Sequence, residues 1–328
     1  MGTIKELIIK PVYRKTRDIL WQLCLAEKEK RRWENIIDQS EPTEQSIYYV
    51  IRRPGDPGLF SYVETTLLQV VYALKNNMIP IVDMKNYAST YHEKDEVGVI
   101  NAWELYFKQL YDVNLEDVLS NRRYILSEDK NIDWSNTPCL DGYYSKQAYW
   151  FWSMLYNRYI RLSDDAIRYF EAEYDEILKD KAAQTLGVLV RGTDYKYAKG
   201  HAIQPDVNEI IVKVRNVIRK KGFRYIYLAT EELAVVKRFQ KEFPGCILTN
   251  KRMYFDQYDF SDGIHLNDII VDRDRDKYWR GMEYLSSVCL LSKCGGLVAG
   301  ACGGSYGAFY MSNGGYRYTC FWNLGIVN

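Results

Sequence analysis

The stretch that decides the fold is Thr185-Leu-Gly-Val-Leu-Val-Arg-Gly-Thr-Asp194, an apolar run that ends abruptly in polar residues. A short apolar run bounded by polar turn residues is typical of a buried strand in a parallel sheet. We therefore expect a strand over residues 185–190 and a polar loop over 191–204. Arg191 is the first charge after this strand, where a charge without a partner would be costly. We interpret it as an anion ligand, with an internal ion pair to Asp194 as the alternative.

The sequence that follows this loop alternates between helical and strand patterns. Gly222, after an amphipathic run, is typical of a helix end. We expect helices over residues 206–221, 231–243 and 276–293, and strands over 225–229, 246–248, 296–299 and 318–321. This alternation predicts a doubly wound α/β domain, whose ligands bind at the carboxyl ends of the strands.

A second α/β pattern precedes the first in the chain. Ile47–Ile51 has the composition of a strand, Ser61 can cap a helix, and residues 79–83 form another apolar run. A strand, helix and strand in this order imply parallel pairing. The aromatic-rich residues 85–180 are expected to form helices and loops, with a helix over 158–178 that Ser163 or Asp164 caps. The aromatic cluster around Trp150 is either core or a platform for an acceptor sugar.

We therefore predict an α/β protein with two Rossmann-like domains that face each other across a cleft. The predicted units are an N-terminal helical segment over residues 1–45, an acceptor-side domain over 46–180 and a nucleotide-binding domain over 181–328. The first unit is basic and loosely amphipathic. It is either a helical flap packed on the body or a segment that contacts anionic lipid.

Composition excludes several classes of protein. The 328 residues include 44 Lys and Arg against 43 Asp and Glu, a net charge of +1 that argues against bulk binding to nucleic acid. Hydrophobic residues at 47% and charged residues at 27% are ordinary for a globular protein. Seven cysteines without CxxC spacing indicate reduced thiols and a cytoplasmic protein. No signal-peptide pattern and no apolar run of about 18 residues is present.

The predicted strand ends share one chemistry. Each leads into a polar loop, and these loops begin at Arg52, Arg191, Thr230 and Gly300. Arginine binds phosphate oxygens bidentately, and a glycine-rich turn at a helix N-terminus points N–H groups at an anion. The run 300–307 matches neither the P-loop nor the GxGxxG pattern. We expect Ser305 to bind phosphate, the alternative being a tight turn without a ligand.

Metal binding is not expected. The three histidines lack ligand spacing. Asp272-Arg-Asp-Arg-Asp276 contains a DxD pattern that holds a divalent metal in some nucleotide-sugar enzymes. Interleaved arginines and a following helix favour carboxylates that interact with the helix dipole. His201 either contacts a donor phosphate or sugar, or fixes the loop.

Three motifs in order resemble the α-1,6-fucosyltransferase and O-fucosyltransferase superfamily. The first runs from Val188 to Lys196 and continues as His201-Ala-Ile-Gln-Pro, where the family reads approximately H-V-R-R-T-D-K and then H-P-I. The second is Tyr225 to Glu232, and the third is Leu290 to Ala299 followed by Gly304-Ser305. Gly58-Leu-Phe, together with Asn101-Ala-Trp-Glu, looks like the N-terminal domain of the bacterial nodulation-type enzymes.

This resemblance implies a GT-B fold, a GDP-fucose donor, inversion at the anomeric carbon and no metal or other cofactor. Carried over by position, Arg191 would bind the β-phosphate, and Asp194 would orient the loop or help to deprotonate the acceptor. The remaining donor-binding positions would be His201, Thr230, Glu231, Gly304, Ser305 and Gly58. Leu189 and Gly192 depart from the motif, which has histidine and a second arginine there.

The sequence thus predicts a glycosyltransferase that transfers fucose from GDP-fucose to an oligosaccharide or lipid-linked glycan of a bacterial surface polysaccharide. A lipid-linked acceptor would bring the enzyme to the inner face of the membrane. Arg191 and the 300–305 turn would stabilise the departing diphosphate without a metal, and Asp194, less favourably Glu283, would accept the acceptor proton. The alternatives are a transferase that uses UDP- or dTDP-sugars and a binding protein that has lost catalysis.

Overall fold

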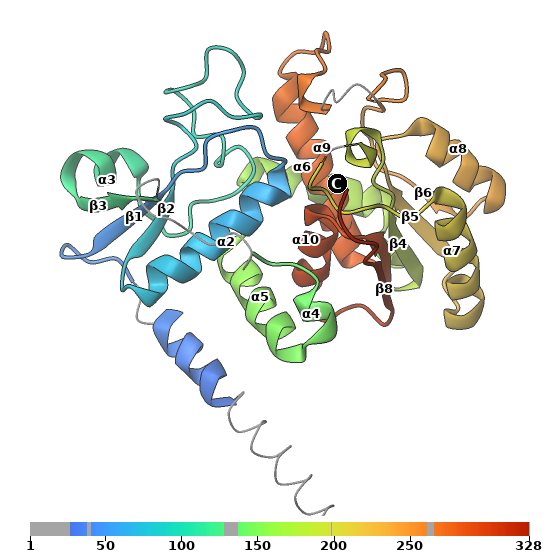
Figure 1. Cartoon of the computed structure of the whole chain (residues 1–328), viewed down its shortest axis with the longest axis horizontal. Helices are drawn as coiled ribbons and strands as arrows, with labels where there is room; N and C mark the ends of the chain where they lie inside the picture. Colours follow the sequence, from blue (N-terminus) through green and yellow to red (C-terminus); the bar gives the residue numbers. More distant parts are fainter. Residues whose placement is uncertain (1–26, 38–40, 128–136, 198, 261–265, 328) are drawn as a thin grey trace, which may run out of the picture.

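A computed structural model describes residues 27–37, 41–127, 137–197, 199–260 and 266–327. The described chain forms a mixed α/β structure with two parallel sheets, one in each half (Figure 1). Residues 27–37 are helical and bury Trp33 against Phe151. The predictions for residues 1–26 lie outside the described residues.

The C-terminal sheet has five parallel strands in the order β6-β5-β4-β7-β8. Its strands are β4 (Thr185–Leu189), β5 (Tyr225–Ala229), β6 (Ile247–Leu248), β7 (Gly296–Gly300) and β8 (Thr319–Trp322). The chain builds outward from β4 to β6, then returns to place β7 on the other side of β4. The strand order therefore reverses between β4 and β7, the point where doubly wound sheets bind their ligands.

Four helices follow or connect these strands in the described part of this half, and the three predicted over residues 206–221, 231–243 and 276–293 begin and end within two residues of the predicted positions. They are α7 (Val207–Lys221), α8 (Leu233–Glu242), α9 (Asp276–Lys293) and α10 (Gly303–Met311). The Asp206 side chain caps α7, and Gly222 ends it with a left-handed φ of 68°. The predicted α/β pattern of this half is confirmed.

The N-terminal sheet has three parallel strands in the order β2-β1-β3. They are β1 (Ile47–Ile51), β2 (Ile79–Val82) and β3 (Arg123–Leu126), and α2 (Leu59–Lys75) joins the first two. We did not predict β3. It begins with two exposed residues, so it lacks the continuous apolar run of the buried strands.

Further helices lie in the segments that connect the strands. They are α3 (Leu115–Asn121), α4 (Asp141–Tyr144), α5 (Lys146–Tyr159) and α6 (Asp164–Ile177), with 3₁₀ turns η3 (Lys179–Gln184), η4 (Thr193–Lys196) and η5 (Leu266–Asp268). The start predicted at residue 158 is wrong, because α6 begins at Asp164, whereas the predicted cap at Ser163 is confirmed: its hydroxyl accepts from Ala166 N–H. Trp152 and Tyr156 of α5 are buried, so this part of the aromatic cluster is core.

The two halves share one hydrophobic core. It extends from β1 and α2 through α5 to α9 and α10. At Gly307 of α10, an added Cβ would lie 2.2 Å from the Phe60 ring of α2, so only glycine permits this approach. The domain limits after residues 45 and 180 stay a prediction. Among the described residues, no helix has the length and apolar character that crossing a membrane requires.

Candidate functional site

Arg191 lies directly beyond β4, beside the reversal of strand order. Its guanidinium forms ion pairs with Glu231, which follows β5, and with Asp194 Oδ1 at 3.5 Å. The Arg191 side chain is 15% exposed. Burial lowers the pKa of Arg191, but the two carboxylates outweigh this and raise it. Arg191 therefore stays charged, and the ion pair with Asp194, which was the alternative to an anion ligand, is present.

A cavity of about 210 Å³ opens beside Arg191, between the two halves of the molecule. Gly58, Thr90, Tyr91 and Glu93 line it from the N-terminal half. The C-terminal half contributes Arg191, Glu231, Arg252, Phe255, Leu266, Ile269, Ile270, Val271, Asp276, Lys277, Arg280, Glu283 and Tyr284. The predicted site residues Arg191, Glu231 and Gly58, together with the weaker candidate Glu283, thus line the same cavity.

The walls of the cavity carry paired charges and neutral phenols. Arg280 forms an ion pair with Asp276 at 2.6 Å and donates to the Leu266 carbonyl at 2.7 Å. Burial raises the pKa of Tyr91 and that of Tyr284, so both phenols are protonated at neutral pH. Cationic forks and neutral O–H groups around one space can hold a polar anion.

Asp194 is held on both oxygens. Oδ1 accepts from the Thr193 hydroxyl at 3.0 Å, and Oδ2 accepts from the Leu266 N–H at 3.1 Å. Thr193 itself has a left-handed φ of 52°. A carboxylate with these donors is suited to orient Arg191 and the loop, the first of the two roles that we predicted for it.

The turn before α10 is built differently from the expectation for Ser305. Ser305 is fully buried, and its hydroxyl donates to the Gly300 and Cys302 carbonyls at 2.8 Å while accepting from Cys302 N–H at 3.0 Å. The side chain therefore stabilises the turn and does not line the cavity. At Gly304, an added Cβ would lie 2.3 Å from Tyr284 Oη. The turn thus packs against Tyr284, which lines the cavity.

His201 and Thr230 support the site from outside the cavity. The His201 ring stacks on the Tyr195 ring, with the two ring centres 4.4 Å apart. Arg191 Cζ lies 5.0 Å from the centre of the same Tyr195 ring. This favours the loop-fixing interpretation of His201. The buried Thr230 hydroxyl accepts from the Glu232 N–H at 3.3 Å. Neither side chain lines the cavity.

Gly192 has a local explanation. A Cβ at this position would lie 1.7 Å from Glu232 Oε2, so the place of a side chain is already taken. Glu283, our weaker candidate for a base, lines the cavity but accepts from Arg273 at 2.5 Å and from Met253 N–H at 3.1 Å. Like Asp194, the Glu283 carboxylate is held by hydrogen bonds to other segments of the protein.

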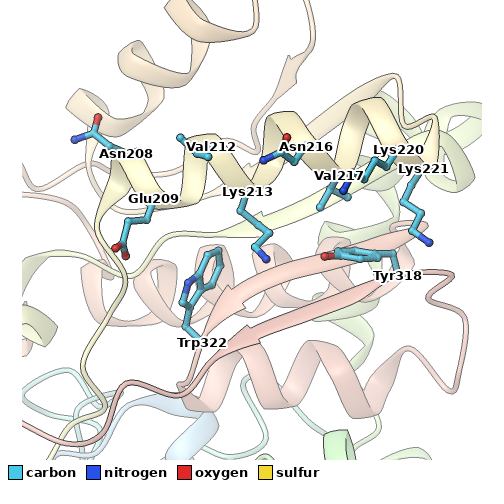
Figure 2. Close-up of a pocket in the computed structure, with 10 residues that line it drawn as sticks. All are labelled: Asn208, Glu209, Val212, Lys213, Asn216, Val217, Lys220, Lys221, Tyr318 and Trp322. Atoms are coloured by element: carbon cyan, nitrogen blue, oxygen red, sulfur yellow. The ribbon is translucent and has the colours of Figure 1, made fainter.

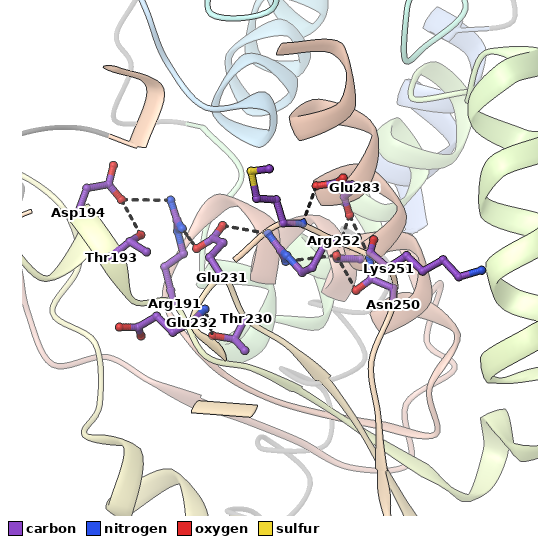
Figure 3. Close-up of polar contacts among 12 residues, drawn as sticks. Arg191, Thr193, Asp194, Thr230, Glu231, Glu232, Asn250, Lys251, Arg252 and Glu283 are labelled. Carbon is purple, nitrogen blue, oxygen red and sulfur yellow. Dashed lines mark hydrogen bonds and ion pairs between the residues drawn. The ribbon is translucent and has the colours of Figure 1, made fainter. Parts of the chain in front are cut away.

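Sequence reasoning missed Arg252. It follows β6 by four residues and reaches Glu231 with Nη2 at 3.5 Å from Oε1 (Figure 3). The signal was available, because polar residues follow β6 as they follow β4 and β5. The prediction of ligand-binding residues at strand ends covered the neighbouring strands but not the strand over residues 246–248.

A second, larger depression lies away from this cavity. It is a surface groove of about 740 Å³ between α7 and β8, lined by Lys213, Lys220, Lys221, Tyr318, Trp322 and residues of the α7 face (Figure 2). Lys213 Nζ lies 6.0 Å from the Trp322 ring centre. None of the predicted site residues lines this groove. Within the described chain, no cluster of His, Cys, Asp and Glu has the makeup of a metal site.

Comparisons with known proteins give distant structural likenesses. No protein-family model and no curated protein sequence matches the chain. The fucosyltransferase NodZ from Bradyrhizobium is similar at 15% identity and a TM-score of 0.47, covering 81% of this chain and 93% of that chain. NodZ α-1,6-fucosyltransferase co-crystallised with GDP is similar at 16% identity and a TM-score of 0.45, covering 77% and 88%. POFUT1 in its apo form is similar at 10% identity and a TM-score of 0.46, covering 87% and 100%. Because every TM-score is below 0.5, we base the function on the site.

Proposed function

We propose that this protein is a glycosyltransferase that uses a nucleotide-activated sugar, with GDP-fucose as the donor. One observation carries the proposal: Arg191, placed where the strand order of the parallel sheet reverses, faces a cavity between the two halves. The three motifs that resemble the fucosyltransferase superfamily support the choice of donor. The acceptor would be a hydroxyl of an oligosaccharide or lipid-linked glycan.

The chemistry follows from charge. A glycosyl diphosphate departs with growing negative charge while the sugar becomes cationic. A guanidinium fixed in a site with little water stabilises that charge as it develops. Arg191 is already charged, and Asp194 holds its guanidinium beside the cavity. We infer that this residue supplies the stabilisation without a metal and that the reaction inverts the anomeric carbon.

The test is a nucleotide screen followed by an activity assay. Thermal unfolding is measured with GDP, UDP and dTDP, and transfer is then measured from radiolabelled GDP-fucose in the presence and absence of EDTA. We expect stabilisation by GDP and transfer or slow hydrolysis that EDTA does not reduce. NMR of the product gives its anomeric configuration. If only UDP or dTDP raises the unfolding temperature, the donor is a UDP- or dTDP-sugar and not GDP-fucose. If a nucleotide binds but no transfer or hydrolysis occurs, the protein is a binding module.

The biological setting is a further part of this proposal. A role in bacterial surface polysaccharide synthesis, on the cytoplasmic face of the membrane, would require a lipid-linked glycan acceptor. Transfer of labelled fucose into butanol-extractable lipid from a membrane fraction tests that acceptor class. Transfer only to free oligosaccharides would instead assign a water-soluble acceptor.

A further inference from the structure

We propose that Arg252 is a second donor-binding arginine, which binds the same phosphate group as Arg191, and that Glu231 lies in the place that this phosphate takes when the donor binds. This inference rests on the proposed function. It concerns a residue on a different strand end, to which the resembled motifs assign no role. The observations behind it are a row of alternating charges, an incompletely satisfied guanidinium and the space beside them.

The charges form one continuous row. Asp194, Arg191, Glu231 and Arg252 follow one another across the carboxyl ends of β4, β5 and β6 (Figure 3). The two arginines contact different oxygens of Glu231, Oε2 for Arg191 and Oε1 for Arg252. A single carboxylate therefore spans the gap between the two guanidinium groups. A phosphate group also offers two oxygens on one central atom, so it can bridge the same gap.

Arg252 is buried but poorly satisfied. Its side chain is only 7% exposed. Nη2 lies 3.5 Å from Glu231, Nη1 donates to the Ser287 hydroxyl at a long 3.4 Å, and Nε is buried without a hydrogen-bond partner among the described residues. Buried cations normally have close partners, because the loss of water is expensive otherwise.

The missing partner can be an anion in the cavity. Arg252 lines the same space of about 210 Å³ as Arg191, so a ligand that reaches one can reach the other. Arginine pairs recognise phosphate by bidentate forks, whereas a carboxylate shared between two arginines satisfies each of them only in part. A bound phosphate would take over the contacts of Glu231, and the carboxylate would move aside. The terminal phosphate of a nucleoside diphosphate is the group that fits both cations.

The experiment measures binding of GDP, GMP, guanosine and inorganic pyrophosphate by calorimetry. The variants are Arg252→Ala, Arg252→Gln, which can retain the contact with Ser287, and Arg238→Ala, a control whose arginine lies exposed on α8. We expect both Arg252 variants to bind GDP and pyrophosphate about 10- to 100-fold more weakly, since each lost charged hydrogen bond is worth about 1.5–3 kcal/mol. Guanosine binding should not change, and Arg238→Ala should behave as the wild type.

The outcomes separate this inference from the proposed function. If the wild type binds no nucleoside diphosphate, the proposed function fails, and pyrophosphate alone then decides the role of Arg252. If the wild type binds GDP and both Arg252 variants bind it equally well, the inference is wrong while the function stands. A variant that weakens guanosine as much as GDP would show general damage to the fold and would also overturn it. Circular dichroism of each variant accompanies the titrations.

Discussion

Two basic regions of this protein use opposite physical strategies. The cavity between the halves holds buried guanidinium groups that share carboxylates, whereas the groove between α7 and β8 presents ammonium groups of lysines over aromatic rings. Burying a charge is expensive unless it is paired, so the first arrangement needs a reason. Exposed lysines cost little and are weakly coupled to their surroundings. The groove is the larger of the two, but its charges cost little free energy to hold, so we propose the smaller cavity, where charges are buried, as the site of the chemistry.

The sharpest way to break this comparison is to remove one cation from each region. Arg191→Ala should lower the rate of transfer about 100- to 1,000-fold, because a fixed cation that stabilises a transition-state charge contributes on that scale. The double variant Lys213→Ala and Lys221→Ala should transfer at the wild-type rate. Initial rates with labelled donor measure both. Equal losses in the two variants would contradict the assignment of the site to the cavity.

The next effect concerns the shared carboxylate. Glu231→Gln removes the charge that two buried arginines have in common, and it should lower the free energy of unfolding by about 3 kcal/mol. Glu209→Gln, an exposed change on α7, should leave the stability unchanged. Urea unfolding measures both variants. Added pyrophosphate should recover much of the loss in Glu231→Gln, and failure to recover it would mean that Glu231 has a purely structural role.

Outside both regions, one buried carboxyl group should make the stability depend on pH. Glu64 of α2 lies beside Gly303 of α10: a Cβ added to Gly303 would be 3.0 Å from Glu64 Oε1. Burial raises the pKa of Glu64 from 4.5 to about 8. The folded state thus keeps a proton that the unfolded state releases between pH 4.5 and 8. The free energy of unfolding should therefore fall as the pH rises through that window. Glu64→Gln should remove this contribution, and an unchanged pH slope would be evidence against it.

The sequence predicted the C-terminal half well and the N-terminal half less well, for a physical reason. Strands such as β4 and β7 are buried along their whole length, and a continuous apolar run is a strong signal. The short strand β3 is partly exposed and begins with a charged residue, so nothing local marks it. The boundary between α5 and α6 depends on the Ser163 cap, which competes with an apolar pattern that crosses it.

The site shows a similar division. Arg191 was predictable because a charge follows a buried strand, and its neighbour Glu231 follows the adjacent strand. Ser305 was expected to face a ligand because it opens a helix, yet its hydroxyl closes the turn on itself. Which way a side chain turns depends on packing from distant segments, such as Phe60 against α10. One sequence shows the position of a residue on a strand end but not the direction of its side chain.

The smallest effect that we predict lies in the groove and completes the comparison. Lys213→Ala removes a cation that lies 6.0 Å from the centre of the Trp322 ring, at the surface. A cation–π contact at an exposed site is worth about 0.5 kcal/mol, so the unfolding midpoint in urea should shift only slightly. Circular dichroism follows the transition, with Lys220→Ala as the control for loss of charge alone. A loss as large as that of Glu231→Gln would mean that the groove, too, holds charges whose pairing is essential, and the distinction between the two regions would then fail.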